Sequence, residues 1–278
     1  MTDAVTIARS DFRNVRRSRI LWGVSAIYVA FMGLLFYTGG TGGSPDVTRT
    51  LFGAVFLTTL LLPLVAIAGS YLAVAGERES NTVRFLLSQP TTRRSVVLGK
   101  FISRGLMLTA ALALAVLVGL GVVAVLYPAF ELLAIAKFAG LTLLLIGAYV
   151  SVSVAVSSMS STRAKAIAGA MGFYFVTDIL AVMNGFGLEA ALRWVLGELL
   201  GLGLSDHLYT GIVAVISPAS AYMNSTLAIF SPDNFELIQT GGQLPFYLES
   251  WFMVAILVAW IVIPLALGAL SFGRAEIA

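Results

Sequence analysis

Long apolar runs alternate with short polar segments along almost the whole chain. Six of these runs come close to or exceed the roughly 20 residues that a helix needs to cross about 30 Å of hydrocarbon. They cover residues 20–37, 52–75, 101–127, 138–157, 166–183 and 251–270. Inside a bilayer each segment must satisfy its own backbone hydrogen bonds, so the runs predict helices. The pattern therefore predicts an all-α integral membrane protein with six transmembrane helices, forming one domain over residues 1–278.

The segment before the first run, residues 1–19, carries an apolar stripe at helical spacing. The stripe consists of Val5, Ala8, Phe12 and Val15. Five arginines flank it, namely Arg9, Arg13, Arg16, Arg17 and Arg19. An apolar stripe beside a basic face is typical of an amphipathic helix that lies on a membrane surface. The alternative is a solvated charge run that only sets the orientation of the first span.

The basic residues between the runs follow the positive-inside rule. If the amino terminus is cytoplasmic, the inside segments contain the five arginines above together with Arg78, Arg84, Arg93, Arg94, Lys100, Arg104, Arg163, Lys165 and Arg274. The outside segments keep only Arg49, Lys137 and Arg193. We therefore expect a multi-pass protein of the cell (plasma) membrane with both termini in the cytoplasm.

The external stretch from 184 to 250 is apolar in two pieces without a clean span. Its first piece has an apolar stripe that suits a helix lying at the outer interface, formed by Leu188, Leu192, Val195 and Leu199. Its second piece, residues 209–230, is interrupted by Pro218. A pair of helices that re-enter the membrane without crossing it fits this pattern. One extra true span, which would place the carboxyl terminus outside, is the alternative.

Composition supports the membrane assignment and excludes several other classes of protein. Of the 278 residues 59% are hydrophobic and 11% are charged, against roughly 25% charged in a soluble domain. The net charge of +3 arises between the apolar runs, where basic residues act as topology signals, so we expect no nucleic-acid partner. The chain has no cysteine and a single histidine, His207. We therefore expect no disulfide, no thiolate chemistry and no metal site.

Between the second and third runs lies the segment GERESNTVRFLLSQPTTRRSVVLGKF, residues 76–101. Val83, Leu86 and Leu87 form an apolar face at helical spacing, and Pro90 follows closely. Asn81 or Thr82 would cap the start of a helix about seven residues long, and the proline would end it. A helix that short is marginal in water. Its apolar face must therefore dock against the membrane surface, the protein's own bundle or a partner.

This segment resembles the cytoplasmic loop of type-2 ABC exporter permeases. The resemblance rests on Glu77, Arg78, Thr82, Leu86, Leu87, Pro90, Arg93, Gly99 and Lys100, and on Ile7, Ala8, Arg9 and Phe12 near the amino terminus. Within that class the chain is most similar to the six-span permeases that include the copper-processing one beside nitrous-oxide reductase. In outline the resemblance covers nearly the whole chain, but only about 25 residues match closely.

The resemblance implies a permease subunit that forms an export pathway, pairs with a second permease copy or a related permease, and couples to a separate ABC ATPase. Residues 1–19 would be the elbow helix, the loop of residues 76–100 would carry the coupling helix, and residues 184–250 would hold re-entrant helices. Three residues would pack into the ATPase, namely Val83, Leu86 and Leu87. Further contacts would come from Glu77, Arg78, Thr82, Arg84, Pro90, Arg93, Arg94 and Lys100. For any single rim arginine, plain topology and lipid-headgroup contact is the alternative.

The chain lacks the motif G-x-x-x-x-G-K-[ST], so we expect ATP and Mg²⁺ to bind the partner subunit and no cofactor to bind this chain. A catalytic membrane enzyme is disfavoured by the absence of HExxH and of cysteine. A secondary transporter usually needs several polar groups or broken helices at the midplane, and only Asp178 qualifies. This residue is either part of a translocation path or a protonated or hydrogen-bonded group near a helix end at about Asn184. A non-catalytic structural membrane subunit is the remaining alternative.

Overall fold

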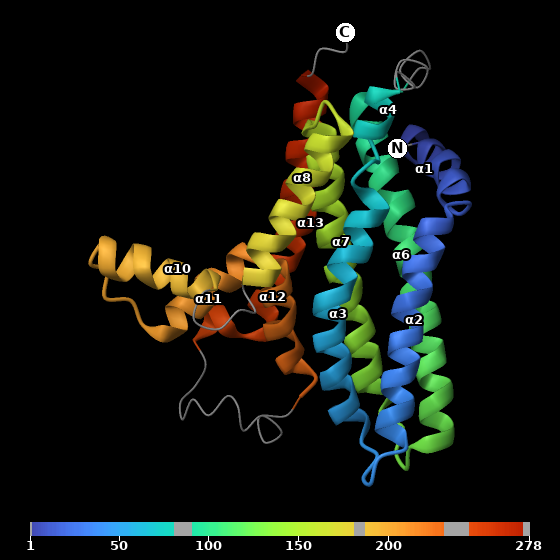
Figure 1. The fold of residues 1–278 in the computed structure, drawn as a ribbon, viewed down its shortest axis with the longest axis vertical. Coiled ribbons are helices and arrows are strands. Elements are labelled where there is room, and N and C mark those ends of the chain that lie inside the picture. Colours follow the sequence, from blue (N-terminus) through green and yellow to red (C-terminus); the bar gives the residue numbers. More distant parts are fainter. Residues whose placement is uncertain (1, 81–90, 181–186, 231–244, 275–278) are drawn as a thin grey trace.

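The computed structural model of the chain describes residues 2–80, 91–180, 187–230 and 245–274, and this part of the chain is helical without any strand. Long helices form an elongated bundle (Figure 1). They are α2 (Arg19–Gly40), α3 (Val47–Ser70), α6 (Arg93–Leu126), α7 (Leu132–Met159) and α13 (Ser250–Arg274). The shorter ones are α1 (Thr2–Val15), α4 (Ala75–Glu79), α8 (Arg163–Tyr174), α10 (Leu188–Leu192), α11 (Asp206–Ile216) and α12 (Pro218–Ser225).

Five stretches of helix in the described residues are long and apolar enough to cross a bilayer. They are Leu21–Gly40, Val47–Glu79, Arg93–Leu126, Leu132–Met159 and Ser250–Arg274, and each contains most or all of one predicted run. The predicted span at 166–183 corresponds to α8 and the π-helical turn Phe175–Ile179 that continues it. This helix runs into residues 181–186, which lie outside the described residues. The structure thus supports five candidate spans, and the sixth crossing stays a prediction.

The helix α6 begins at Arg93, earlier than the predicted span at 101–127. Thr92 is its N-cap, and its hydroxyl accepts a hydrogen bond of 3.1 Å from the backbone N–H of Ser95. A side-chain cap satisfies one of the free N–H groups in the first helical turn. The polar residues that follow the loop, from Arg93 onward, are therefore part of the long helix.

The helices α7 and α13 pack side by side along their length, with small residues at the contact. A Cβ atom added to Gly268 would lie 2.7 Å from the Cα of Ala155, and one added to Gly147 would lie 2.7 Å from Ile261. The hydroxyl of Ser151 donates a hydrogen bond of 2.7 Å to the carbonyl of Ile261. Small residues and hydroxyl bridges are the usual means by which membrane helices approach closely.

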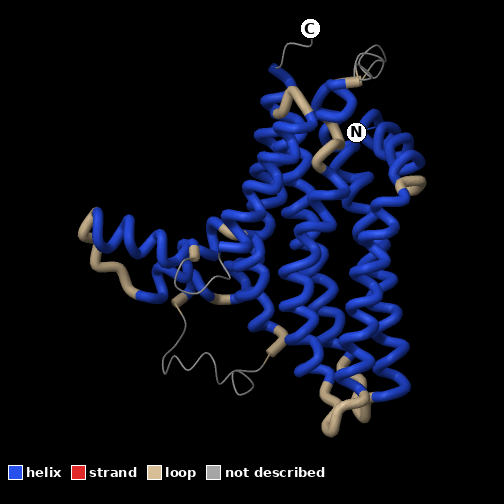
Figure 2. The backbone as a smooth tube through the Cα atoms, in the orientation of Figure 1, coloured by secondary structure: helices blue, strands red, loops and turns tan. Residues whose placement is uncertain are grey.

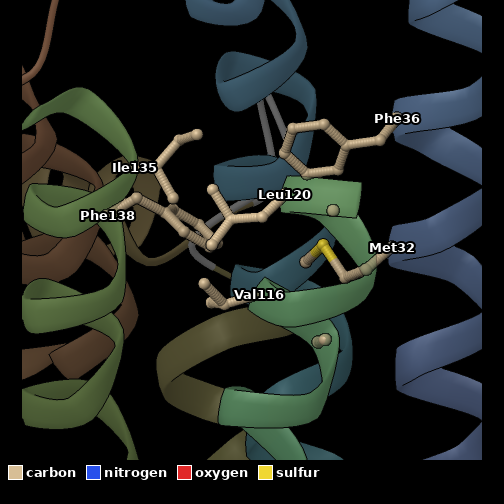
Figure 3. Close-up of a pocket in the computed structure, with 8 residues that line it drawn as sticks. Met32, Phe36, Val116, Leu120, Ile135 and Phe138 are labelled. Atoms are coloured by element: carbon tan, nitrogen blue, oxygen red, sulfur yellow. The ribbon is translucent and has the colours of Figure 1, made fainter. Parts of the chain in front are cut away.

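Elsewhere the bundle is filled by large apolar side chains. Figure 3 shows the contact of α2, α6 and α7, where Phe36, Leu120 and Phe138 converge from three helices. The cavity left between them is about 10 Å³, which is at the lower limit for a single water molecule. This part of the bundle is therefore closely packed.

The helix α1 lies at the same end of the bundle as α4 and packs against α6 (Figures 1 and 2). It is helical as predicted, and part of the predicted stripe faces the bundle. Ala8 and Val15 of the stripe are buried together with Ala4 and Ile7, whereas Val5 is 61% exposed. The location of α1 at a membrane surface stays a prediction.

The region that follows α8 forms an arm beside the bundle. The helix α10 and the π-helical turn Arg193–Leu199 project sideways (Figure 1) and leave Trp194, Leu199 and Leu200 exposed. The helices α11 and α12 meet at Ser217, which caps α12, with Pro218 at its first position. The side chain of Tyr222 is fully buried and shares a hydrogen bond of 3.0 Å with Thr142 of α7.

Neither α11 with 11 residues nor α12 with 8 residues is long enough to span a bilayer. Pro218 starts a new helix instead of continuing the old one, since a proline in a helix interior removes a hydrogen bond. In the described residues, the stretch 209–230 is thus two helices and not one continuous span. Their depth in a membrane stays a prediction.

Candidate functional site at the end of the bundle

The residues flanking the predicted coupling segment are described, but the segment itself is not. Thr82, Val83, Arg84, Leu86, Leu87 and Pro90 lie outside the described residues. Glu77 and Arg78 come before this gap, and Arg93, Arg94 and Lys100 follow it. The structure therefore shows how the two ends of the loop are held.

A cluster of four charged side chains joins α1, α4 and α6. The ammonium of Lys100 lies 2.6 Å from Oδ1 of Asp11 and also pairs with the carboxylate of Glu77. Arg104, one turn further along α6, places Nε 3.3 Å from Oδ2 of Asp11. The hydroxyl of Ser103 donates to the same oxygen. We call Asp11, Glu77, Lys100 and Arg104 the ionic cluster.

The ionic cluster is buried and balanced in charge. The side chains of Lys100 and Asp11 are 4% and 6% exposed. Removing charges from water costs several kcal/mol per ion, so such groups need close partners. Burial by itself would raise the pKa of Asp11, but Lys100, Arg104 and the hydrogen bonds of the cluster outweigh it and lower that pKa below its ordinary value. Asp11 is therefore a carboxylate at neutral pH, and it holds α1 against α6.

The close approach of α1 to α6 depends on Gly99. A Cβ atom at this position would lie 2.7 Å from Cγ2 of Ile7 and 3.0 Å from the carbonyl oxygen of Ala4. Any side chain would therefore push the two helices apart. Arg104 also donates a hydrogen bond of 2.9 Å to the carbonyl of Gly69, which links the cluster to the end of α3.

The chain before the gap is fixed to α7. The backbone N–H groups of Val74 and Ala75 both donate to the hydroxyl oxygen of Ser157, each at 3.0 Å. Arg78 donates to the carbonyl of Ser160 at 3.2 Å. Because Ser157 is fully buried, this anchoring lies inside the bundle and not at its surface.

The carboxyl-terminal end of α13 contacts both sides of the gap. Arg93 donates to the carbonyl oxygens of Phe272 and Gly273 at 3.1 and 3.3 Å. The guanidinium carbons of Arg78 and Arg93 lie 5.9 and 6.0 Å from the centre of the Phe272 ring, within the range of cation–π attraction. In addition, Glu79 accepts a hydrogen bond of 2.7 Å from the backbone N–H of Arg163 at the start of α8. We call Arg78, Glu79 and Arg93 the loop anchors.

The ionic cluster and the loop anchors together connect both ends of segment 81–90 to α1, α6, α7, α8 and α13. Hydrogen bonds and ion pairs thus link the residues on both sides of that segment to several long helices. Packed elements of this kind move as rigid bodies rather than deforming continuously. The arrangement is suited to transmit motion between the ends of this loop and the long helices.

Sequence reasoning placed Lys100 and Arg94 together among the residues that contact a partner. In the structure Arg94 is exposed, whereas Lys100 is buried in the ionic cluster. A role of Lys100 in binding an ATPase stays a prediction. What the structure shows is its ion pairs with Asp11 and Glu77 of the same chain. Asp11, Ser103 and Phe272 were missed. For Asp11 a signal exists, since it lies four residues after Ile7 and three after Ala8, on the buried face of α1.

A second buried carboxylate, Asp178, lies in the π-helical turn after α8. The hydroxyl of Tyr149 donates a hydrogen bond to Oδ1 of Asp178, and both side chains are buried. Its Oδ2 atom has no hydrogen-bond partner, and no ion pair involves this carboxylate, among the described residues. The structure therefore shows a hydrogen-bonded Asp178 inside the bundle, and its part in a translocation path stays a prediction. Within the described ranges no three His, Cys, Asp or Glu side chains could hold a metal ion together.

Comparison with known proteins gives a consistent result. The family model for ABC-2 family transporter proteins matches residues 5–277. The chain is 30% identical over 276 residues to a protein of Pseudomonas aeruginosa described as a probable ABC transporter permease protein NosY, covering 95% of this chain and 93% of that protein. It is 27% identical over 290 residues to the protein of the same description from Stutzerimonas stutzeri, covering 99% of each.

Proposed function

The chain belongs to the ABC-2 family of transporter proteins, and from this premise we propose that it couples export of a substrate to ATP hydrolysis by a separate ATPase subunit. It is an ABC transporter permease with several apolar helices, so it is a multi-pass membrane protein. Binding of ATP and Mg²⁺ by the ATPase, pairing with a second permease copy and cytoplasmic termini in the cell membrane are parts of the proposal.

The anchoring of both ends of segment 81–90 is the observation that carries this proposal. A loop that only joins two spans needs no buried ion pairs, and each such group must repay its loss of hydration. Here the residues before the gap are fixed to α7 and α13, and those after it are fixed to α1 and α13. That arrangement is what a short docked helix needs if it is to move the bundle.

In the proposed mechanism Val83, Leu86 and Leu87 of the loop pack into a groove of the ATPase. Thr82, Arg84 and Pro90 shape the same surface, while Arg94 contributes an exposed charge at its edge. When two ATPase subunits close on ATP, segment 81–90 is displaced, and the loop anchors pass this displacement to α13 and α7. The ionic cluster carries α1 along.

Coupling between the two subunits is reciprocal. If closure on ATP favours one conformation of the permease, a substrate that binds that conformation favours closure by the same factor. In this mechanism the apolar face of the loop binds the ATPase, and the anchors transmit its movement to the bundle. Loss of the apolar face removes the ATPase, whereas loss of an anchor leaves the ATPase bound but uncoupled.

The test is purification of the tagged chain from its native membrane, with identification of any accompanying chain that carries a P-loop motif. We expect Leu86→Asp to remove the ATPase from the purified complex, because the substitution places a charge on the docked apolar face. Ser88→Asp is the matched control, since it introduces the same charge in the same segment on the opposite side of the predicted helix. It should leave the complex intact.

The proposal fails if Leu86→Asp leaves the complex and its ATP turnover unchanged. It also fails if no chain with a P-loop motif accompanies the unchanged permease. Equal loss with Leu86→Asp and Ser88→Asp would show that the segment is sensitive to any added charge, and it would contradict docking by the apolar face.

A further inference from the structure

Two cavities adjoin along the face formed by α7 and α13. The first has a volume of about 460 Å³ and is lined from α7, α8, α11 and α13, with Phe173, Trp260, Ile263 and Pro264 among its walls. The second has a volume of about 500 Å³ and lies at the end of the bundle that carries the loop anchors. Met159 and Leu267 line both. Each volume lies in the range of a ligand site, roughly 300–1,000 Å³.

The first cavity is apolar throughout. In the part of the chain that the structure describes, none of its lining residues carries a charge or a hydroxyl, and the indole N–H of Trp260 already donates to the carbonyl of Val215 at 3.0 Å. A ligand that enters it finds no unsatisfied polar partner. Such a site favours a hydrocarbon chain, and each buried CH₂ group contributes about 0.8 kcal/mol.

The second cavity is positively charged. Among the described residues its polar lining is Arg78, Ser161, Ser271 and Arg274, and none of the described lining residues is acidic. The hydrogen bonds that Arg78 makes within the described residues go to neutral carbonyl oxygens of Ser158 and Ser160. The ammonium of Lys165 lies 3.4 Å from the hydroxyl of Ser161 and adds a further cation nearby. Arginine fits phosphate and carboxylate groups well because its planar donors match their oxygens.

We propose that the α7–α13 groove binds an anionic amphiphile, with its acyl chain in the apolar cavity beside Trp260 and its acidic head group between Arg78 and Arg274. An anionic phospholipid has this chemistry. The proposal rests on the function proposed above, because it names the class of substrate that the permease moves. The groove adjoins α13 and Arg78, so the elements that hold the coupling loop also line the substrate site.

Binding can be measured on the permease alone, by quenching of Trp260 fluorescence in vesicles. The chain has four tryptophans, and the other three, Trp22, Trp194 and Trp251, are more than half exposed. A variant with these three changed to phenylalanine reports only from Trp260. The probes are phosphatidylglycerol and phosphatidylcholine with brominated acyl chains, each at a low fraction in vesicles of unlabelled phosphatidylcholine.

We expect brominated phosphatidylglycerol to quench Trp260 at lower fractions than brominated phosphatidylcholine. Arg274→Gln should reduce this preference by about tenfold, the effect of one lost charge-assisted hydrogen bond. Ala259→Phe, which fills the apolar cavity, should reduce quenching by both lipids. Equal quenching by the two lipids, or a preference that survives both substitutions, would overturn the proposed site.

A second arm separates a transported substrate from a lipid that merely resides in the groove. In the reconstituted complex with the ATPase, phosphatidylglycerol should raise ATP turnover, and Arg274→Gln should abolish the increase. Selective quenching without any change in ATP turnover would overturn the assignment as substrate. If instead the ATPase fails to co-purify, the proposed function fails while the quenching result still decides the binding site.

Discussion

Asp11 and Asp178 are both buried carboxylates, but their surroundings differ in one respect. Asp11 has Lys100 and Arg104 beside it and accepts a hydrogen bond from Ser103. Asp178 accepts a hydrogen bond from Tyr149 and, among the described residues, has no cation near it. The first is thus a charged group that ties helices together, and the second is a polar group that one hydroxyl accommodates.

The difference indicates that the two carboxylates serve different purposes. Removing one member of a charge-balanced cluster is strongly destabilising, because the remaining charges stay buried without a partner. A single hydrogen bond contributes only about 0.5–1.5 kcal/mol. The ionic cluster therefore fixes α1 and α6 as one unit, whereas the surroundings of Asp178 can change without unfolding the bundle.

The largest expected effect comes from removing the central cation of the cluster. Lys100→Met leaves the carboxylates of Asp11 and Glu77 buried with Arg104 as their one remaining cation, and we expect a loss of about 3–5 kcal/mol in the free energy of unfolding. The measurement is reversible unfolding in mixed micelles. Arg94→Met, an exposed arginine on the same helix, is the control and should cost less than about 0.5 kcal/mol. Similar losses in the two variants would contradict the role given to Lys100.

A substitution that pushes α1 away from α6 should cause the next largest loss of stability. Gly99→Ala places a methyl group 2.7 Å from Ile7, and we expect a loss of about 1–3 kcal/mol by overpacking. Gly105→Ala is the matched control, because nothing lies within 4 Å of its Cβ position on the same helix. Thermal unfolding of the two variants in detergent decides the matter, and equal stability would show that α1 does not depend on this contact.

Substitutions around Asp178 should lower the free energy of unfolding only slightly, and Tyr149→Phe should cost more than Asp178→Asn. Tyr149→Phe removes the hydroxyl that donates to Oδ1 of Asp178 and should cost about 0.5–1.5 kcal/mol, the contribution of one hydrogen bond. Asp178→Asn keeps an acceptor for Tyr149, so its cost should be under about 1 kcal/mol. Unfolding measurements on both variants and on the double variant test this order. A larger loss for Asp178→Asn than for Tyr149→Phe would indicate that the charge of Asp178 is needed.

The smallest effect concerns pH. Because the folded-state pKa of Asp11 lies below its ordinary value of 3.8, its contribution to stability is present above that value and is lost as pH falls through the lowered pKa. We expect α1 to stay docked from pH 7 to pH 5 and to loosen only below about pH 4.

The natural absence of cysteine makes this pH dependence measurable. A spin label on Val5→Cys, an exposed position of α1, should gain mobility below about pH 4. In an Asp11→Asn background the mobility should no longer depend on pH in this range. Loosening between pH 7 and pH 5 would contradict the charge state assigned to Asp11.

Much of the fold follows from the apolar runs, because the bilayer forces each long run into a helix. Five of the predicted runs coincide with long apolar helices, and the break at Pro218 divides α11 from α12 as the proline indicated. The run at 166–183 is less regular, since its helix passes into a π-helical turn around Asp178. Periodicity alone did not reveal this turn.

The candidate site was predicted only in part, because its main contacts join residues far apart in the chain. The loop was identified by its own residues. Glu77, Arg78 and Arg93 form contacts within the chain, and their contacts with an ATPase stay a prediction. Asp11 was overlooked because an acidic residue on a basic helix looks like a solvated group until its partner on α6 is known. Arg93 contacts the backbone carbonyl of Phe272, and residue types along the chain do not predict a contact of this kind.

The central claim is that the loop anchors transmit the motion of the ATPase to α13. Arg93 and Arg94 are neighbours on α6, and Arg93 is hydrogen-bonded to the end of α13 while Arg94 is exposed. The direct measurement is the ATP turnover of the reconstituted complex for Arg93→Met and Arg94→Met, with the amount of bound ATPase determined in each. The account predicts that Arg93→Met keeps its ATPase but loses the effect of the permease on turnover by at least about fivefold, the lower end of a coupling free energy. Unchanged turnover in Arg93→Met, with the ATPase bound, would contradict it.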